Sequence, residues 1–123
     1  MNAQAGKLMR RTADMGLYLV RMDHPHGEGW AQFVVEHVQY LKTLIDQGTL
    51  LASGPLQGTP LRAGFLIIMA DSQQQVEALV AADPFSREGL ICQLRIEQWD
   101  PLFGEWANRS SQTLPPALAS LLD

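Results

Sequence analysis

The strongest pattern in the chain is a run of apolar residues at helical spacing between residues 30 and 48. In WAQFVVEHVQYLKTLIDQG the apolar positions recur every three or four residues, which is typical of an α-helix with one buried face. Gly48 is well placed to end this helix, because glycine tolerates the left-handed conformation found at helix C-termini. A second helical pattern covers residues 72–82 and stops before an Asp-Pro pair, whose proline disfavours a helical residue in front of it.

Four other apolar segments have the length and composition of β-strands. They cover residues 16–22, 49–56, 63–70 and 90–99. With the two helices they give the order β-α-β-β-α-β, which is the split βαβ arrangement of ferredoxin-like folds. The chain is therefore predicted to form an α+β domain in which a four-stranded antiparallel sheet carries both helices on one face.

The opposite face of this sheet is also predicted to be apolar. Residues 63–70 read AGFLIIMA, without a polar side chain, which favours a strand that is buried on both sides. A sheet face this apolar needs a cover, and a second copy of the same sheet is the simplest one. We therefore expect a homodimer.

The chain has 123 residues, which is enough for one domain with a single core. We expect this domain to cover residues 16–99, with an N-terminal extension over residues 1–15. A C-terminal extension over residues 100–123 is expected to pack on the domain or on the dimer partner. The formal charge of −4, with no compensating cluster of Lys and Arg, argues against nucleic acid as a partner.

The cellular compartment is predicted from two features. The apolar run GLYLV, which follows the basic N-terminal residues, is too short for a signal-peptide core or a membrane span. The single cysteine, Cys92, excludes a disulfide framework, so we expect a cytoplasmic protein that does not bind membranes. Because Cys92 alternates with polar neighbours and has no obvious base beside it, we expect a buried, inert thiol.

A histidine, His37, lies in the middle of the apolar face of the first helix. A buried imidazole needs a hydrogen-bond partner, since an unpaired buried polar group costs about 1–3 kcal/mol. Asp83, at the end of the second helix, is a candidate, because the two helices lie side by side in this arrangement. A carboxylate there would orient the imidazole, fix its tautomer and stabilise its charged form, as a general acid/base requires. Alternatively, His37 is an ordinary core residue and Asp83 only begins a turn.

Three further groups of residues could carry chemistry. Ser53 and Gly54 offer a hydroxyl and a close backbone approach at the end of a strand, although ordinary turn geometry would also explain them. His24 and His26 lie two apart in a loop but lack the spacing of a strong zinc signature, so no metal site is expected. Arg62 could bind an anionic substrate, but a solvated position at a strand edge is favoured.

Taken together, two segments resemble the YciI-like (YCII-related) proteins. EHVQYLKTLIDQGTLLASGPL has the helix histidine, the glycine that ends the helix and a Gly-Pro after the next strand. ALVAADPFSREGL has an Asp-Pro-Phe before the last strand. The resemblance covers roughly residues 16–99. It implies the dimeric α+β barrel fold, in which two ferredoxin-like sheets close against each other.

The resemblance also implies a site. A His-Asp dyad proposed for the family in a cleft falls on His37 and Asp83. Residues near the same cleft would bind the substrate: Ser53, Gly54, Pro55 and Phe85. One related member is a dehydrochlorinase of chlorinated hydroxyhydroquinones, and muconolactone isomerases share the barrel.

We therefore expect a small enzyme that needs no cofactor and transfers a proton on a small cyclic or aromatic substrate, as a lyase or isomerase does. The alternative is a homodimer that binds a small molecule or regulates without catalysis, with the dyad only joining two helices. A haem-handling or monooxygenase role would rest on His37 alone as an axial ligand.

Overall fold

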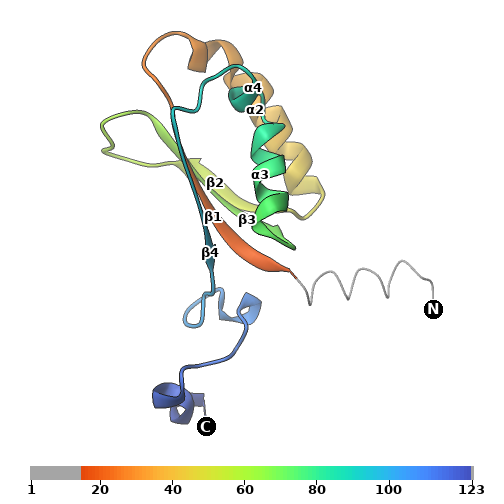
Figure 1. Ribbon diagram of the computed structural model, residues 1–123, viewed down its shortest axis with the longest axis vertical. Helices are drawn as coiled ribbons and strands as arrows, with labels where there is room; N and C mark the ends of the chain where they lie inside the picture. Colours follow the sequence, from red (N-terminus) through yellow and green to blue (C-terminus); the bar gives the residue numbers. More distant parts are fainter. Residues whose placement is uncertain (1–14, 123) are drawn as a thin grey trace, which may run out of the picture.

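The computed structural model describes residues 15–122, and its elements follow the predicted order (Figure 1). The N-terminal extension expected over residues 1–15 lies, apart from Met15, outside the described residues. The strands and helices of the domain are β1 (Gly16–Asp23), α2 (Gly29–Asp46), β2 (Leu50–Pro55), β3 (Ala63–Ala70), α3 (Gln73–Ala81), α4 (Pro84–Arg87) and β4 (Gln93–Trp99).

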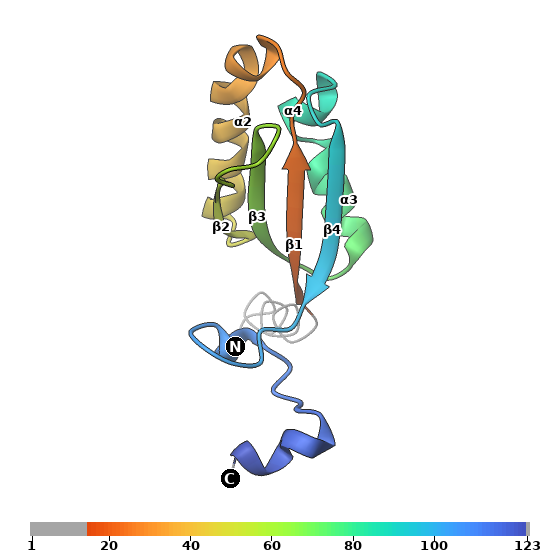
Figure 2. The same ribbon diagram turned by 90° about the vertical axis from the view of Figure 1, so that its left-hand side faces the viewer.

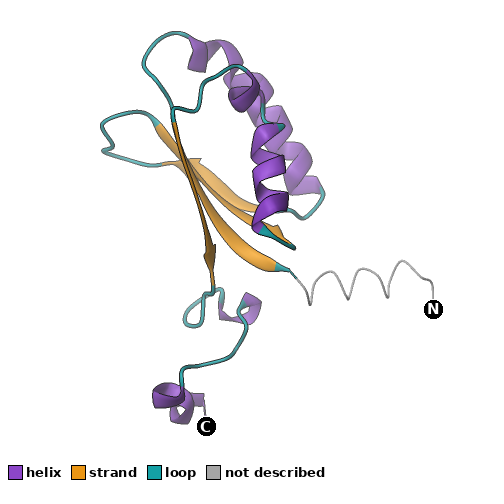
Figure 3. Cartoon of the chain, in the orientation of Figure 1, coloured by secondary structure: helices purple, strands orange, loops and turns teal. Residues whose placement is uncertain are grey.

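The four strands form one antiparallel sheet in the order β2-β3-β1-β4. In the centre of the sheet Val20 lies opposite Leu66 on β3 and opposite Ile96 on β4. Helices α2 and α3 cover the same face of the sheet, as Figure 3 shows. The predicted α+β, ferredoxin-like architecture is therefore confirmed.

The hydrophobic core lies between this sheet face and the two helices. It is formed by alternate strand residues and by the inner faces of the helices: Tyr18, Val20, Met22, Leu41, Leu44, Leu50, Leu66, Ile68, Ala70, Val76 and Val80. The strand residues between these point to the other face, which Figure 2 views directly. There Leu19, Phe65 and Ile67 are half-buried in the single chain, so this face is apolar but is not covered by a helix.

Local sequence signals set the ends of both long helices. Gly48 has a φ of +75°, and the N–H groups of Gly48 and Thr49 donate to the carbonyls of Ile45 and Leu44. This is the Schellman arrangement, and it confirms the predicted role of Gly48 in ending α2. At the start of α3 the hydroxyl of Ser72 accepts a hydrogen bond from the backbone of Gln75.

The last strand is shorter than predicted. It begins at Gln93 rather than at residue 90, because β1 ends at Asp23, the residue paired with Gln93, and offers no further strand partner. Residues 90–92 instead return from α4, with the Leu90 N–H donating to the Phe85 carbonyl. This connection brings the segment after α4 against the end of β1.

The C-terminal segment leaves the end of β4 and extends beyond the ends of the strands (Figure 2). Two short 3-10 helices, Ala107–Arg109 and Pro116–Leu122, are its regular elements. The Asp100 carboxylate accepts hydrogen bonds from the hydroxyl and backbone N–H of Ser111, and these keep the pKa of Asp100 below its usual range. Trp99 and Trp106 lie with their ring centroids 6.2 Å apart, so the segment is also joined to β4 by an aromatic contact.

Within residues 15–122, no helix combines the length and hydropathy needed to cross a membrane. The cytoplasmic location stays a prediction.

Candidate functional site

The first candidate pair, His37 and Asp83, is in direct contact. The Nδ1 atom of His37 lies 2.9 Å and 2.8 Å from the two carboxylate oxygens of Asp83. Because a carboxylate can only accept, Nδ1 carries the proton and donates it to Asp83. The other ring nitrogen, Nε2, is then the one available for a proton transfer. The expected contact between the two helices is therefore present.

Asp83 is held rigidly because it also begins α4. Its side chain accepts the backbone N–H of Phe85 at 2.9 Å, and Pro84 occupies the first helical position. An aspartate followed by proline is a favoured helix start, since proline has no N–H to satisfy there and has a helical φ. Only 1% of Asp83 is exposed, so this carboxylate lies behind the imidazole.

Tyr40 joins the helices that carry the pair. Its hydroxyl donates a 2.7 Å hydrogen bond to the Leu79 carbonyl, which links α2 to α3 one turn after His37. Burial raises the pKa of the Tyr40 phenol, with a smaller contribution from the charge of Asp83. The relative position of the two helices is thus fixed close to the His37–Asp83 contact.

Phe85 lies against both His37 and a second histidine, His24. Its ring is stacked on the His37 ring with centroids 4.2 Å apart and an interplanar angle of 18°. The His24 ring lies 4.8 Å from Phe85 in a tilted arrangement. Phe85 is 1% exposed, so a single turn of helix supplies a fully buried ring that supports two imidazoles.

These residues surround a cavity of about 480 Å³ between α2 and the strands β2 and β3. The predicted site residues that line it are His37, Ser53, Gly54, Pro55 and Phe85. Asp83 does not line it and reaches it only through His37. Most of the wall is apolar, with Val34, Leu41 and Leu66 among the lining residues, which suits a small, largely apolar ligand.

Two polar residues that the sequence offered only as weak candidates also line this cavity. Arg62 is exposed next to the start of β3, as expected, and it also lines the cavity, with its guanidinium carbon 3.8 Å from the centre of the Trp30 ring. This cation–π contact holds a positive charge at the cavity wall. His24, considered only with His26 as a weak metal signal, is 4% exposed and lines the cavity as well.

The imidazole of His24 is held by the backbone after α4. Its Nδ1 atom lies 2.7 Å from the Leu90 carbonyl, an acceptor, so Nδ1 carries the proton. Burial lowers the pKa of His24 below its ordinary value; the Leu90 hydrogen bond opposes this lowering and the charge of His37 adds to it. His24 in the folded protein therefore takes up a proton at a lower pH than free histidine does.

Acidification is expected to destabilise the wild type more than a His24→Asn variant. Because the folded pKa of His24 is lowered, the unfolded chain takes up a proton near pH ~6.5 that the folded chain does not. The stabilisation from neutral His24 is present above this pH and is lost progressively as the pH falls toward the folded pKa. Urea unfolding at about pH 7.5 and about pH 5.5 measures the loss in free energy of unfolding for the wild type and for His24→Asn. Equal losses in the two proteins would contradict the expectation.

The prediction for Cys92 is wrong. Cys92 is exposed, and its thiol donates a weak hydrogen bond to the Asp23 carbonyl at 3.4 Å. The physical reason is that β4 begins one residue later, so Cys92 lies in the connection rather than inside the sheet.

Among residues 15–122, no group of three or more His, Cys, Asp or Glu side chains is arranged to hold a metal ion.

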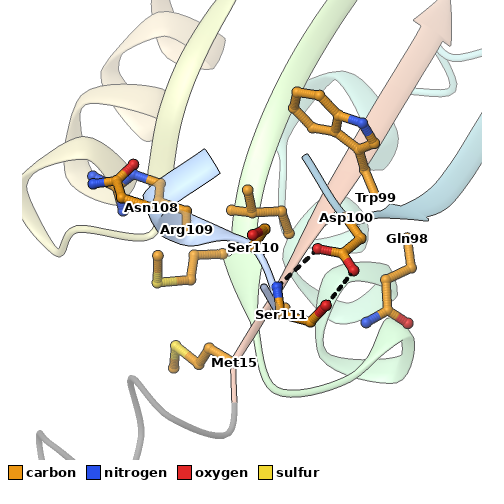
Figure 4. A pocket seen from close by; sticks show the side chains of 11 residues that line it. Met15, Gln98, Trp99, Asp100, Asn108, Arg109, Ser110 and Ser111 are labelled. Carbon is orange, nitrogen blue, oxygen red and sulfur yellow. Dashed lines mark hydrogen bonds between the residues drawn. The ribbon is translucent and has the colours of Figure 1, made fainter. Parts of the chain in front are cut away.

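A larger hollow, of about 790 Å³, lies at the other end of the sheet (Figure 4). Met15, Trp99 and Arg109 are among its lining residues, and the Asp100–Ser111 hydrogen bonds cross it. Asp100, the carboxylate that lines this hollow, is already hydrogen-bonded to Ser111, and no histidine or pair of stacked aromatic rings is among the lining residues. The chemistry-bearing residues therefore belong to the smaller cavity.

The similar solved structures include one of a protein with a described activity and a bound small molecule. It is the 5-chloro-2-hydroxyhydroquinone dehydrochlorinase from Burkholderia phenoliruptrix AC1100, in complex with 2,5-dihydroxybenzoquinone. This chain and the dehydrochlorinase are 26% identical in sequence, and their structures superpose with a TM-score of 0.60. The match covers 68% of this chain and 93% of the dehydrochlorinase.

More distant matches have other descriptions. A dimeric ferredoxin-like protein of unknown function from Jannaschia sp. CCS1 is 19% identical with a TM-score of 0.44, over 70% of this chain and 98% of the other. A putative antibiotic biosynthesis monooxygenase from Bacteriodes thetaiotaomicron VPI-5482 is 15% identical with a TM-score of 0.43, over 75% and 93%. Both are too remote to bear on function. No curated protein gives a significant match.

The family comparison covers the whole domain. The YCII-related domain matches residues 15–100, from the start of β1 to the end of β4. This range includes the His37–Asp83 contact and every lining residue of the smaller cavity. The chain therefore belongs to the YCII-related domain family.

Proposed function

We propose that this protein is a small enzyme in which His37 transfers a proton on a small cyclic or aromatic substrate held in the cavity between α2, β2 and β3. The observation that carries the proposal is the His37–Asp83 contact. Asp83 holds the Nδ1 proton of an imidazole that lines the cavity, which leaves Nε2 for the substrate. His37 is the proposed catalytic residue and Asp83 the residue that positions it.

The proposed chemistry follows from this arrangement. Neutral His37 has a lone pair on Nε2 and can take a proton from the substrate as a general base. The imidazolium that forms is stabilised by the carboxylate of Asp83, 2.8 Å from Nδ1. In loss of HCl, the proton goes to the base and the chlorine leaves as chloride with the electron pair of the C–Cl bond. In an isomerisation, the same proton returns to another atom of the substrate.

The surroundings of His37 support a flat, mostly apolar substrate. Trp30 lines the cavity, and its ring can contact the face or edge of a substrate ring. Phe85 also borders the cavity, but it is 1% exposed and its ring is stacked on His37. Ser53 supplies a hydroxyl and Arg62 a positive charge at the same wall. The similar dehydrochlorinase is described with a substrate and a bound molecule that are hydroxylated six-membered rings, which favours the same class here.

The test is turnover of 5-chloro-2-hydroxyhydroquinone, the compound named for the similar dehydrochlorinase. Chloride release is measured under nitrogen with wild-type protein and without protein, because such hydroquinones oxidise in air. Release above the protein-free rate supports the lyase reaction. If release equals the protein-free rate and a panel of lactones is also unchanged, the protein is not an enzyme of this type.

A second candidate is ligand binding without catalysis. It is favoured by one observation, which is that the His37–Asp83 contact also has a structural role. Asp83 caps α4, and His37 joins α2 to this cap. In that case a small aromatic molecule would bind in the cavity and leave unchanged.

We also propose that the protein is a homodimer formed through the open face of the sheet. Leu19, Phe65 and Ile67 lie on this face without a helix over them. An apolar sheet face of this kind favours association with a like surface, and two-fold pairing is the commonest way to achieve it. Analytical ultracentrifugation should therefore give twice the mass of one chain, and a monodisperse monomer at micromolar concentration would refute the pairing.

A further inference from the structure

His24 has one ring nitrogen engaged with the protein and one directed to the cavity. Nδ1 donates its proton to the Leu90 carbonyl at 2.7 Å, so in the neutral ring the lone pair lies on Nε2. In the described part of the chain, no buried side-chain nitrogen or oxygen lacks a hydrogen-bond partner. The ring makes its one hydrogen bond there through Nδ1, so Nε2 is not fully enclosed, and because His24 lines the cavity we infer that Nε2 faces it.

Space next to this nitrogen is provided by a glycine. Gly64 lies on β3 and lines the same cavity. A Cβ atom at Gly64 would lie 4.0 Å from Nε2 of His24 and 3.9 Å from Met22. The missing side chain therefore leaves a small recess beside an unprotonated nitrogen, and any larger residue would reach into it.

We propose that His24 is a second substrate-contacting residue, whose Nε2 accepts a hydrogen bond from a hydroxyl group of the substrate. This inference rests on the proposed function and adds to it that the substrate must carry a hydroxyl group. His37 and His24 both lie against Phe85, so their two cavity-facing nitrogens border the same space. His37 is paired with a carboxylate and can become charged, whereas His24 is paired with a carbonyl and acts as an acceptor.

The substrate class follows from these two roles. The unprotonated nitrogen of a neutral imidazole is an acceptor only, so Nε2 favours ligands that present an O–H group at the recess by Gly64. The buried environment that lowers the pKa of His24 keeps it in this accepting state. Together with the aromatic wall of Trp30 and Phe85, this points to a hydroxylated aromatic ring rather than to an ether, a ketone or a hydrocarbon.

Two variants separate this contact from the structural role of His24. In His24→Asn the amide N–H can replace Nδ1 and still donate to the Leu90 carbonyl, but the accepting nitrogen is gone. In Gly64→Ala the His24–Leu90 hydrogen bond is untouched, and a methyl group enters the recess at ordinary contact distance. His26→Asn is the matched control, because His26 is exposed on the same loop and does not line the cavity.

The probes are the monomethyl and dimethyl ethers of hydroquinone, which differ in a single O–H group. Binding to the full chain is measured by calorimetry, and the ¹⁵N signal of His24 Nε2 is followed by NMR in the wild type. We expect the wild type and His26→Asn to prefer the monomethyl ether by about tenfold, the effect of one well-formed hydrogen bond. This preference should disappear in His24→Asn and fall in Gly64→Ala, and only the monomethyl ether should shift the Nε2 signal.

The results also separate this inference from the proposed function. If the wild type prefers the monomethyl ether and both variants keep that preference, His24 is not the acceptor, while proton transfer by His37 is unaffected. If the wild type binds the two ethers equally and the Nε2 signal does not move, the substrate does not need a hydroxyl group at His24. The proposed enzyme activity is then tested by chloride release alone. Should His24→Asn fail to fold, Gly64→Ala and the wild-type NMR signal decide the question.

Discussion

Replacing His37 with alanine is expected to reduce chloride release from 5-chloro-2-hydroxyhydroquinone by about 10²–10⁴-fold, the usual contribution of a positioned general base. The substitution removes the only cavity-lining imidazole that is paired with a carboxylate in the described chain. It leaves the cap of α4 intact, because the Phe85 N–H still donates to Asp83. Circular dichroism and chloride release on the same samples measure folding and turnover together.

His37→Asn is the matched control for this loss. Its amide N–H can still donate to Asp83, so the link between α2 and α4 is kept, whereas Nε2 is absent. We expect it to be as inactive as the alanine variant and more stable. If either variant turns over the substrate at the wild-type rate, His37 is not the base, and the dyad is structural.

Replacing Asp83 with alanine is expected to lower the free energy of unfolding by about 2–4 kcal/mol. Loss of the N-cap of α4 accounts for about 1 kcal/mol of this. The larger part comes from His37, whose side chain is only 12% exposed. Its Nδ1–H would lose its acceptor, which costs about 1–3 kcal/mol. Urea unfolding followed by tryptophan fluorescence gives the value.

Ser72→Ala provides the comparison, since Ser72 caps α3 through the Gln75 N–H and has no histidine partner. It should cost about 1 kcal/mol, the effect of a cap alone. Equal losses for the two variants would mean that the His37–Asp83 contact adds nothing to stability. Asp83→Asn should fold better than the alanine variant and still lose turnover, because a neutral amide does not stabilise an imidazolium.

The elements of the fold were predictable because their signals are local. The three-to-four-residue spacing in α2, the glycine at its end and the Asp-Pro pair after α3 are each found within a few residues. The first strand and β3 were equally clear from their apolar runs. The start of β4 was not, because it depends on where β1 ends, and that pairing joins residues about 70 apart in the chain.

The candidate site was only partly predictable for the same reason. His37 is conspicuous as a polar residue on an apolar face, and Asp83 precedes a proline, so each could be found in its own segment. His24 gave no such signal, since it lies in a loop rich in Pro and Gly and its partner, Leu90, is 66 residues away. Arg62 likewise meets Trp30 only after β3 has paired with β1 and β2.

The cavity has two halves that are held in different ways. One half is the paired and stacked group of His37, Asp83 and Phe85 on the helices, where each side chain supports another. The other half comes from the hairpin of β2 and β3, where Ser53, Gly54 and Pro55 are exposed and a side chain at Gly54 would meet no neighbour. Changes in the exposed part of this hairpin can therefore alter which compound fits, with little effect on the proposed proton-transfer pair.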